Sequence, residues 1–272
     1  MQGALSESRT RPLLPSNNHI KGISMKSIFL AIAFVALTQP VLAQRWQWPD
    51  NPKNVQVLPK SATGRELQRT MFSFTAGLGV RCTYCHVGEE GRDFSEYDFP
   101  SDVKPEKNKA RIMIKMMSAV NNEYLAAMHV DSSSALKVAC ITCHRGNATP
   151  VMLEDKLKRS FDRNGIDSTL KQYRALRDQF YGGFTYNFKD QTLVRLAEKI
   201  LEDSTKSAAA IQVLKLNIEL YPASAFSYAR LGGIFEAQGN AKEAIENYEQ
   251  AVKLDPNNRM AKRQLERLQG KK

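Results

Sequence analysis

The residues with the clearest chemistry are four cysteines and two histidines that repeat one spacing. The chain has no other cysteine, and the four form two C-x-x-C-H motifs: Cys82, Cys85 and His86, then Cys140, Cys143 and His144. C-x-x-C-H is the attachment signature of c-type haem. Each thiol adds to one vinyl group of the porphyrin, and the following histidine is aimed at the iron. We therefore predict two covalently attached c-type haems, with His86 and His144 as axial iron ligands.

Three other uses of paired cysteines fit this sequence less well. Zinc ribbons place their cysteine pairs about 15–20 residues apart, whereas Cys85 and Cys140 are 55 positions apart. A zinc site would also leave the histidine after each pair unexplained. A thioredoxin-like site needs a βαβ pattern that the sequence lacks. Two disulfides that close such short loops would be strained and would stabilise little.

A second axial ligand is needed for a low-spin haem, and Met71 is the candidate for the first motif. It is the one methionine between the predicted mature start and that motif, and no histidine lies there. Thr63 and Glu66 form a capping-box pattern, which predicts a helix that begins beside them and carries Met71. Gly77 and Gly79 are expected to end this helix. The alternative is that Met71 fills a gap in the core.

The candidates for the second axial ligand are more numerous. Apolar residues at helical spacing precede the second motif, namely Met113, Met116, Met117, Val120 and Tyr124. This pattern predicts one apolar helix face, which is also typical of a packed core, so periodicity does not choose among the three methionines. Met128, His129 and Met152 are further candidates.

The N-terminal residues are predicted to export the protein. Residues 25–43 combine a basic start, an apolar run of about ten residues and a small residue at the cleavage point, as secretory signal peptides do. We expect Met25 to be the true start, residues 1–24 to come from a start codon assigned too early, and the mature chain to begin at Gln44. The alternative is an uncleaved anchor, although a spanning helix needs roughly 20 residues. The expected location is the periplasm or another extracytoplasmic compartment.

Three stretches of the chain resemble the cytochrome c subunit family of photosynthetic reaction centres. They are residues 78–86, 110–116 and 140–146, within a similarity that covers roughly residues 60–150. In that family each haem has a helix that carries its methionine ligand, then a turn, then C-x-x-C-H. The resemblance implies Met71 as ligand to the first haem and Met113 to the second, with Met116 and His129 as alternatives. Purple-bacterial members carry four haems and a lipid anchor, so the resemblance does not by itself imply photosynthesis.

The C-terminal half contains a tetratricopeptide-like repeat over residues 225–258. Eight residues stand at its signature positions: Tyr228, Leu231, Gly232, Phe235, Ala244, Tyr248, Ala251 and Pro256. Residues 191–224 resemble a weaker repeat, with Asn217 where a small residue is usual. Residues 258–268 are expected to form a basic capping helix. Stacked helix pairs of this kind leave a concave face, which predicts either a docking module for a partner or a structural extension.

The remaining segment, residues 151–190, is predicted to be a helical connector. We expect a helix near residues 168–181, ended by Gly182 and Gly183, and a loop over Phe184–Lys189. The domains are then the leader, a di-haem cytochrome c domain over residues 44–150, this connector, and the repeats with their capping helix over residues 191–272. The predicted fold is mainly α, with a multihaem-cytochrome-like domain whose core is largely porphyrin, followed by a short TPR-like α-solenoid.

The modest, dispersed positive charge argues against a nucleic-acid partner and favours an acidic protein or an anionic membrane surface. The whole chain has a formal net charge of +11. Removal of residues 1–43, which hold four basic residues and one acidic residue, leaves +8 on the mature chain. This surplus is spread over both halves, and no nucleic-acid recognition motif accompanies it. We expect steering toward an acidic redox partner or toward anionic headgroups at a membrane surface.

These observations predict an electron carrier and not an enzyme. With both axial positions filled, the iron has no place for a substrate, and electrons pass between protein donors and acceptors. The alternative is a di-haem enzyme such as a peroxidase, with one five-coordinate haem. A third possibility is an assembly module that also carries haem.

Overall fold

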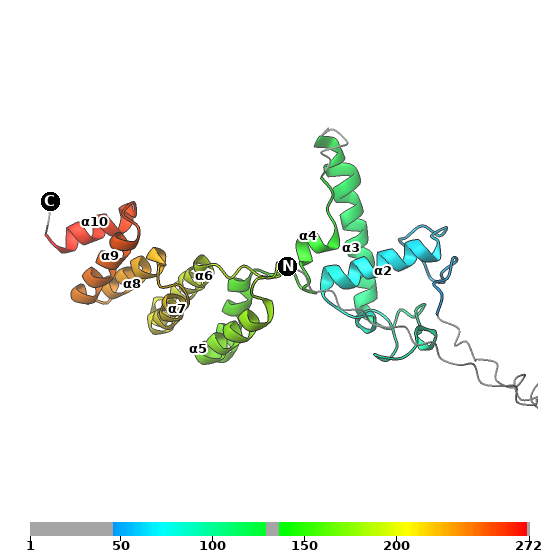
Figure 1. Cartoon of the computed structure of the whole chain (residues 1–272), viewed down its shortest axis with the longest axis horizontal. Helices are drawn as coiled ribbons and strands as arrows, with labels where there is room; N and C mark the ends of the chain where they lie inside the picture. The colour runs from blue at the N-terminus through cyan, green and yellow to red at the C-terminus, as the bar shows by residue number, and fades with distance from the viewer. Residues whose placement is uncertain (1–45, 129–135, 271–272) are drawn as a thin grey trace, which may run out of the picture. The chain divides into compact units, whose positions relative to one another are not determined.

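The computed structural model describes residues 46–128 and 136–270, and in these ranges the chain is almost entirely helical. The described residues contain no extended β-strand; Val87 and Asp98 form an isolated antiparallel bridge. Figure 1 shows the order of the elements along the chain. The mainly α prediction is confirmed. The predicted signal peptide and His129 lie outside the described residues.

The described residues of the half that carries the two C-x-x-C-H motifs form three α-helices and several short 3₁₀ or π turns. The elements are α2 (Gly64–Leu78), η1 (Cys82–Tyr84), η2 (Phe94–Glu96), α3 (Pro105–Ala119), η3 (Val120–Tyr124), η4 (Ala126–Met128) and α4 (Cys140–His144). Few of its hydrophobic side chains are buried: among the described residues before Cys140, only Ala62 and Leu67 are. This half therefore has little apolar core of its own.

Helix α2 begins at its predicted cap and ends at Gly79, one of the two glycines expected to end it. The Thr63 side chain accepts a hydrogen bond from the Glu66 backbone N–H, and the Glu66 carboxylate accepts one from the Thr63 backbone N–H at 2.9 Å. This reciprocal cap satisfies two donors that the first turn leaves open. Gly79 ends the helix in the left-handed conformation, with φ 65°. Gly77 stays inside the helix and is buried.

Helix α3 continues without a break into a turn of π-helix. The turn, η3, spans Val120–Tyr124, and the Leu125 N–H bonds to the Val120 carbonyl at 2.9 Å. The predicted helix is therefore present, but no residue of α3 is buried in this structure. Its methionine face does not pack into a protein core.

The C-terminal half is a succession of packed helices. They are α5 (Leu153–Phe180), α6 (Asp190–Leu201), η5 (Ser204–Lys206), α7 (Ser207–Leu220), α8 (Ala225–Ala237), α9 (Ala241–Leu254) and α10 (Arg259–Leu268). Gly165 interrupts α5 with φ 75°, which divides it into two helical parts. The second part matches the helix expected near residues 168–181, whereas the first part, from Leu153, was not predicted.

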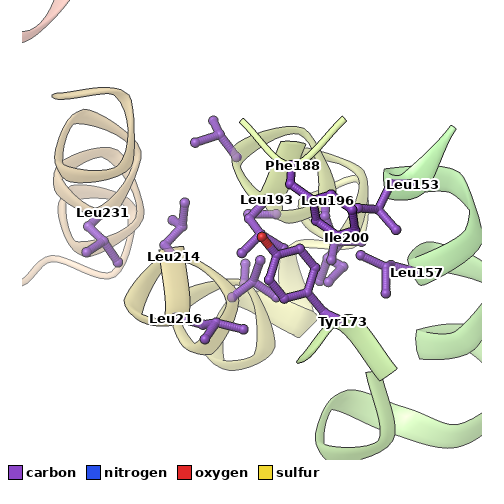
Figure 2. Close-up of a cluster of buried hydrophobic side chains, with 14 of the residues drawn as sticks. Leu153, Leu157, Tyr173, Phe188, Leu193, Leu196, Ile200, Leu214, Leu216 and Leu231 are labelled. Atoms are coloured by element: carbon purple, nitrogen blue, oxygen red, sulfur yellow. The ribbon is translucent and has the colours of Figure 1, made fainter. Parts of the chain in front are cut away.

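One hydrophobic core joins the helices from α5 to α8. Figure 2 shows Leu157 and Tyr173 of α5 with Leu193 and Ile200 of α6, beside side chains of α7 and α8. All four of these side chains are at most 1% exposed. Residues 151–190 thus share a core with the repeats that follow them.

The predicted repeat over residues 225–258 is a tightly packed pair of helices, α8 and α9. Gly232 lies so close to the Tyr248 ring that an added Cβ would be 2.8 Å from it. The Tyr248 hydroxyl donates to the Glu236 carboxylate at 2.9 Å. A small residue is therefore required at position 232 because a buried aromatic ring from α9 takes the space.

Asn217 departs from the repeat pattern, and the structure gives the reason. Its side chain is fully buried, and its amide donates to the Asp190 carbonyl at 2.8 Å and to the Ser227 hydroxyl at 2.7 Å. These bonds join α7 to the start of α6 and to α8. Both donor hydrogens of the amide find acceptors, which offsets part of the cost of burying this side chain, while its Oδ1 has no partner in the described residues.

Candidate functional site

The first C-x-x-C-H motif forms a single tight turn. The backbone N–H groups of Cys85 and His86 both bond to the Cys82 carbonyl, at 3.2 and 2.9 Å. Cys82 and Cys85 are half-buried and their thiols are free. The turn places both thiols and the histidine on the wall of one cavity of about 430 Å³.

The same cavity contains the predicted partner of His86. Met71 of α2 contributes to the lining, together with aromatic rings from several segments: Trp46, Trp48, Phe74, Tyr97 and Phe99. The ring centroids of His86 and Phe99 are 5.0 Å apart, at an interplanar angle of 74°. One apolar space of the size that binds small ligands thus brings together the two cysteines, the histidine and the methionine that the sequence assigned to the first haem.

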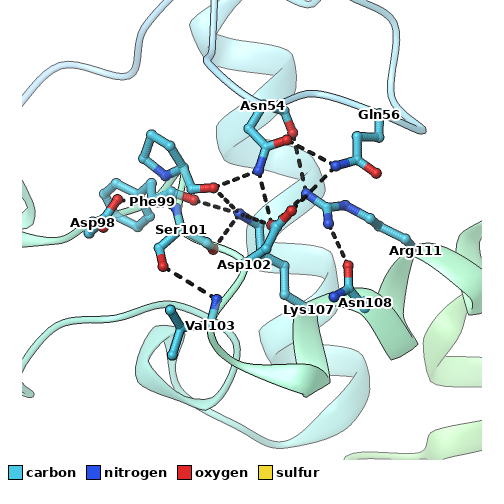
Figure 3. A network of polar contacts seen from close by, with 11 residues as sticks. Asn54, Gln56, Asp98, Phe99, Ser101, Asp102, Val103, Lys107, Asn108 and Arg111 are labelled. Atoms are coloured by element: carbon cyan, nitrogen blue, oxygen red, sulfur yellow. Dashed lines mark hydrogen bonds and ion pairs between the residues drawn. The ribbon is translucent and has the colours of Figure 1, made fainter.

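A polar cluster forms one side of this cavity (Figure 3). The Asp102 carboxylate pairs with Lys107 at 3.0 Å and with Arg111 at 2.9 Å, and it accepts from the Asn54 amide at 3.0 Å. The Lys107 ammonium also donates to three backbone carbonyls between 2.8 and 2.9 Å. Lys107, Arg111 and Asn54 line the cavity, so its wall offers positive charge as well as apolar surface.

Burial and these cations perturb the ionisable groups of the site. Burial, then the positive charge of Lys107, lowers the pKa of His86, which favours the neutral ring that a metal needs as ligand. The Phe99 backbone is close enough to oppose this shift, but it does not complete a hydrogen bond with the buried Nδ1 of His86. Burial also raises the pKa of the Cys85 thiol. The indole N–H of Trp46 is a second buried donor without a partner in the described residues.

The second C-x-x-C-H motif is the short helix α4. Cys140 is half-buried, Cys143 is exposed, both thiols are free, and burial raises the pKa of Cys140. His144 is buried, and its Nδ1 lies 3.0 Å from the Asn147 carbonyl. Because a carbonyl oxygen only accepts, Nδ1 is the donor in this contact, and Nε2 is the ring nitrogen left to bind a metal. This is the arrangement of a metal-binding histidine.

Three of the candidate methionines for the second motif lie on α3, whereas Met128 lies in η4 and Met152 lies just before α5. Met113 is 39% exposed and Met116 is 50% exposed, and neither lines the cavity of the first motif. The π-turn that follows α3 is tied to the second motif: the Asn121 amide donates to the Val138 carbonyl and accepts from the Val138 N–H, both at 2.8 Å. The structure thus links the methionine helix to the approach to Cys140.

Helix α2 connects the two motifs directly. The Gly146 N–H, just after the second motif, bonds to the Gly77 carbonyl at 2.9 Å. A Cβ at Gly77 would lie 2.9 Å from the Cys140 side chain, and a Cβ at Gly79 would lie 2.1 Å from the Gly146 carbonyl oxygen. Glycine is required at both positions because the helix that carries Met71 packs backbone to backbone against the second motif.

The residues present fit haem at the first motif. The cavity has apolar and aromatic walls for a porphyrin, paired thiols beside one histidine, and cations and an unpaired indole N–H for its carboxylates. At the second motif the histidine geometry and the exposed apolar side chains of α3 fit the same group. No three cysteine, histidine, aspartate or glutamate residues gather as a metal cluster within residues 46–128 and 136–270. The described part of the chain also has no helix long and apolar enough to cross a membrane.

Sequence reasoning missed several residues that shape these sites. Asp102 lies outside every motif, and Arg111 falls in the stretch 110–116 without a role assigned to it. Their ion pair beside the cavity leaves no periodic signal. Asn121 acts through two hydrogen bonds to Val138, and Asn147 acts through its bonds to His144 and Tyr186. The one local signal was the pair of aromatic residues Tyr186 and Phe188. Two such residues close together in a loop indicate that the loop is anchored in a hydrophobic core.

These features define a c-type cytochrome. Residues 31–206 match the family model of the photosynthetic reaction centre cytochrome C subunit, and residues 225–258 match the tetratricopeptide repeat model. The first match covers well over half of the chain. The chain therefore belongs to the photosynthetic reaction centre cytochrome c subunit family, and it joins that family's cytochrome region to a tetratricopeptide repeat, as predicted.

Two curated proteins are similar to part of this chain. Over 100 residues it is 35% identical to the photosynthetic reaction center cytochrome c subunit of Thermochromatium tepidum, which covers 36% of this chain and 21% of that protein. Over 114 residues it is 34% identical to cytochrome c-554 of Chloroflexus aurantiacus, which covers 41% of this chain and 24% of that protein. The chain thus spans less than a quarter of the length of these relatives.

Among solved structures, the chain is similar to the first TPR domain of the human RPAP3 protein. The TM-score is 0.31 at 22% identity, over 44% of this chain and 88% of that one. A similarity this loose carries no conclusion, and the repeat assignment rests on the family model.

Proposed function

We propose that this protein is an exported di-haem c-type cytochrome that transfers electrons between protein partners. The observation that carries the proposal is the cavity that brings Cys82, Cys85, His86 and Met71 together. When bound, haem supplies one-electron redox chemistry at its iron. Cys82 and Cys85 would hold the first haem and Cys140 and Cys143 the second, with His86 and His144 as axial ligands.

The second axial ligands in this proposal are Met71 and Met113. Support for Met71 is its place in the wall that His86 also lines. Support for Met113 is the family pattern and its exposed position on α3, with Met116 and His129 as alternatives. Methionine ligation raises the reduction potential of a haem and fills the position that a substrate would need.

The remaining parts of the proposal concern place and partners. Residues 25–43 direct export, and the mature chain from Gln44 acts in the periplasm or a comparable compartment. A redox donor and a redox acceptor meet the cytochrome region. The repeats supply a docking face for a protein partner, and the basic surplus supports peripheral association with anionic membrane surfaces.

The test uses the full chain, expressed with its leader in a bacterium that matures c-type cytochromes. We expect a mature mass that starts at Gln44 and exceeds the polypeptide by two haems, and spectra with low-spin iron and a methionine-to-iron charge-transfer band. A mass equal to the bare polypeptide would overturn the proposal. High-spin ferric iron, or turnover of peroxide, would favour the peroxidase alternative.

Single substitutions test the ligands. Met71→Ala and Met113→Ala should each remove about half of the charge-transfer band, since each haem contributes one methionine bond. Met260→Ala, in α10, is the control and should leave the band intact. If Met113→Ala also leaves it intact, the second haem has another ligand, and Met116 and His129 are examined next.

A further inference from the structure

The histidine of the second motif is connected to the C-terminal helices through two hydrogen bonds. The Asn147 carbonyl accepts from His144 Nδ1 at 3.0 Å. The side-chain amide of the same Asn147 donates to the Tyr186 hydroxyl at 2.6 Å. A residue of the loop between α5 and α6 thus holds the residue that orients His144.

Tyr186 is itself held firmly by the C-terminal helices. It is 7% exposed, and its ring makes edge contacts with Phe180 at 5.5 Å and with Phe188 at 6.3 Å between centroids. The Lys156 ammonium lies 5.7 Å from the ring centroid. Phe188 and Tyr186 belong to the core shared by α5, α6 and α7. The packed core therefore fixes the position of the Tyr186 hydroxyl, although Tyr186 lies in a loop.

The loop that carries Asn147 is anchored at a second point. Gly146 adopts φ 75° and bonds through its N–H to the Gly77 carbonyl of α2. The adjacent residues Gly146 and Asn147 are thus held by two different elements, Gly146 by α2 and Asn147 by Tyr186. The His144 ring, which is buried between these anchors, has little freedom to reorient.

The hydrogen bond to Nδ1 controls what a ligating histidine does for its metal. It fixes the tautomer and the ring orientation, and it makes the ring a stronger electron donor. A more basic axial histidine stabilises the oxidised iron and lowers the reduction potential. A residue that fixes the position of the carbonyl acceptor therefore affects the reduction potential of the haem iron without contacting the haem.

We propose that Tyr186 is a positioning residue for His144, and that the C-terminal helices thereby set the reduction potential of the second haem. This inference rests on the proposed function, and it gives the helices after α4 a role besides docking. The first haem has no such link, since His86 Nδ1 has no hydrogen-bond partner in the described residues.

The test is Tyr186→Phe in the full, haem-loaded chain, followed by a redox titration. The variant removes the hydroxyl and keeps the packed ring. We expect the haem content and the charge-transfer band to be unchanged. The reduction potential of one haem should rise by at most about 59 mV for one electron, which changes the electron-exchange equilibrium between the haems by about threefold to tenfold. Tyr181→Phe, at an exposed ring in the neighbouring turn, should shift neither potential.

Two further variants make the result decisive. Asn147→Ala should give a similar shift, and the double variant with Tyr186→Phe should shift no further, because both changes break one chain of contacts. In a chain with Cys140→Ser and Cys143→Ser, which keeps the first haem alone, Tyr186→Phe should have no effect on the remaining potential.

The outcomes separate this inference from the proposed function. If the parent chain binds no haem, the proposed function fails. If it binds two haems and Tyr186→Phe leaves both potentials unchanged, or shifts the haem retained without Cys140 and Cys143, the inference is overturned and the proposed function stands. If Tyr186→Phe does not fold, the Asn147→Ala titration decides.

Discussion

The Asp102 carboxylate is the centre of a polar cluster of three side chains. It holds Asn54, Lys107 and Arg111 together beside the cavity of the first motif (Figure 3). Hydrogen bonds from Arg111, then from Asn54 and Lys107, hold the pKa of Asp102 well below its usual value of about 3.9. A depressed pKa in the folded state means that ionised Asp102 stabilises the fold above its unfolded pKa.

This predicts a specific pH dependence for Asp102→Asn. The variant should be less stable than the parent near neutral pH, and the difference should close as the pH falls below about 4 and the parent carboxylate becomes protonated. Thermal unfolding of both proteins across this range measures the effect. Asp98→Asn is the control, because it removes a carboxylate charge but keeps an oxygen that can accept the bond from the Ser101 N–H. A gap that stays constant down to acid pH would contradict the assignment.

At the scale of elements, the contact between α2 and the second motif depends on glycine. Gly79 adopts φ 65°, and an added Cβ would lie 2.1 Å from the Gly146 carbonyl oxygen. Gly91 has a similar positive φ of 84° with nothing within 4 Å of its Cβ position. Substitution by alanine would strain the backbone at both glycines, but only at Gly79 would the new Cβ also collide with another residue.

Gly79→Ala should therefore destabilise the protein more than Gly91→Ala. The left-handed backbone costs both variants about 1–3 kcal/mol. The collision should cost Gly79→Ala roughly 1 kcal/mol or more in addition, and it should reduce haem attachment at the second motif. Chemical denaturation and haem content measure the two effects. Equal losses in both variants would mean that α2 does not rely on this contact.

A second pair of glycines tests the repeat formed by α8 and α9. Gly232→Ala would press a methyl group into the Tyr248 ring, at 2.8 Å, whereas at Gly233 the nearest atom is the Tyr248 hydroxyl at 3.6 Å. We expect Gly232→Ala to destabilise by about 1–3 kcal/mol. Gly233→Ala should be neutral, or stabilising by up to about 1 kcal/mol, because alanine favours helix. Urea denaturation should separate the two, and the same sign for both would be contrary to the packing.

At the scale of the whole molecule, charge governs how the protein meets its partners. Without residues 1–43, the proposed leader, the chain has a net charge of +8, which bound haem carboxylates would reduce. The surplus is spread over both halves, and α10 adds a largely basic face with Arg259, Lys262 and Arg263. A positive molecule attracts anionic reagents over distances that salt shortens.

This predicts the salt dependence of electron exchange. The rate of oxidation by an anionic iron complex should fall as NaCl rises from about 10 mM to about 500 mM. The rate with a cationic ruthenium complex should rise over the same range, which excludes a general effect of salt on stability. Stopped-flow absorbance of the haem bands gives both rates. Opposite slopes would show that the contact face is acidic in spite of the net charge.

Local features were predictable from the sequence because their physics is local. The cap of α2 at Thr63 and Glu66, its glycine end at Gly79 and the repeat over residues 225–258 all follow from residues a few positions apart. The helical break at Gly165 was missed, because glycine inside a helical pattern is often tolerated. The π-turn after α3 was missed too, since apolar periodicity continues through it.

The sequence by itself was enough to predict haem attachment, since the spacing of two cysteines and a histidine is a property of one turn of chain. It also determined the helical class, because periodicity and caps are written within each segment. Only the tertiary structure decided which distant groups meet: Met71 with His86 around one cavity, Gly77 and Gly79 against the second motif, and Tyr186 behind Asn147. The reason is physical. Contacts between segments tens of residues apart depend on how their surfaces fit together, and no local pattern encodes that fit.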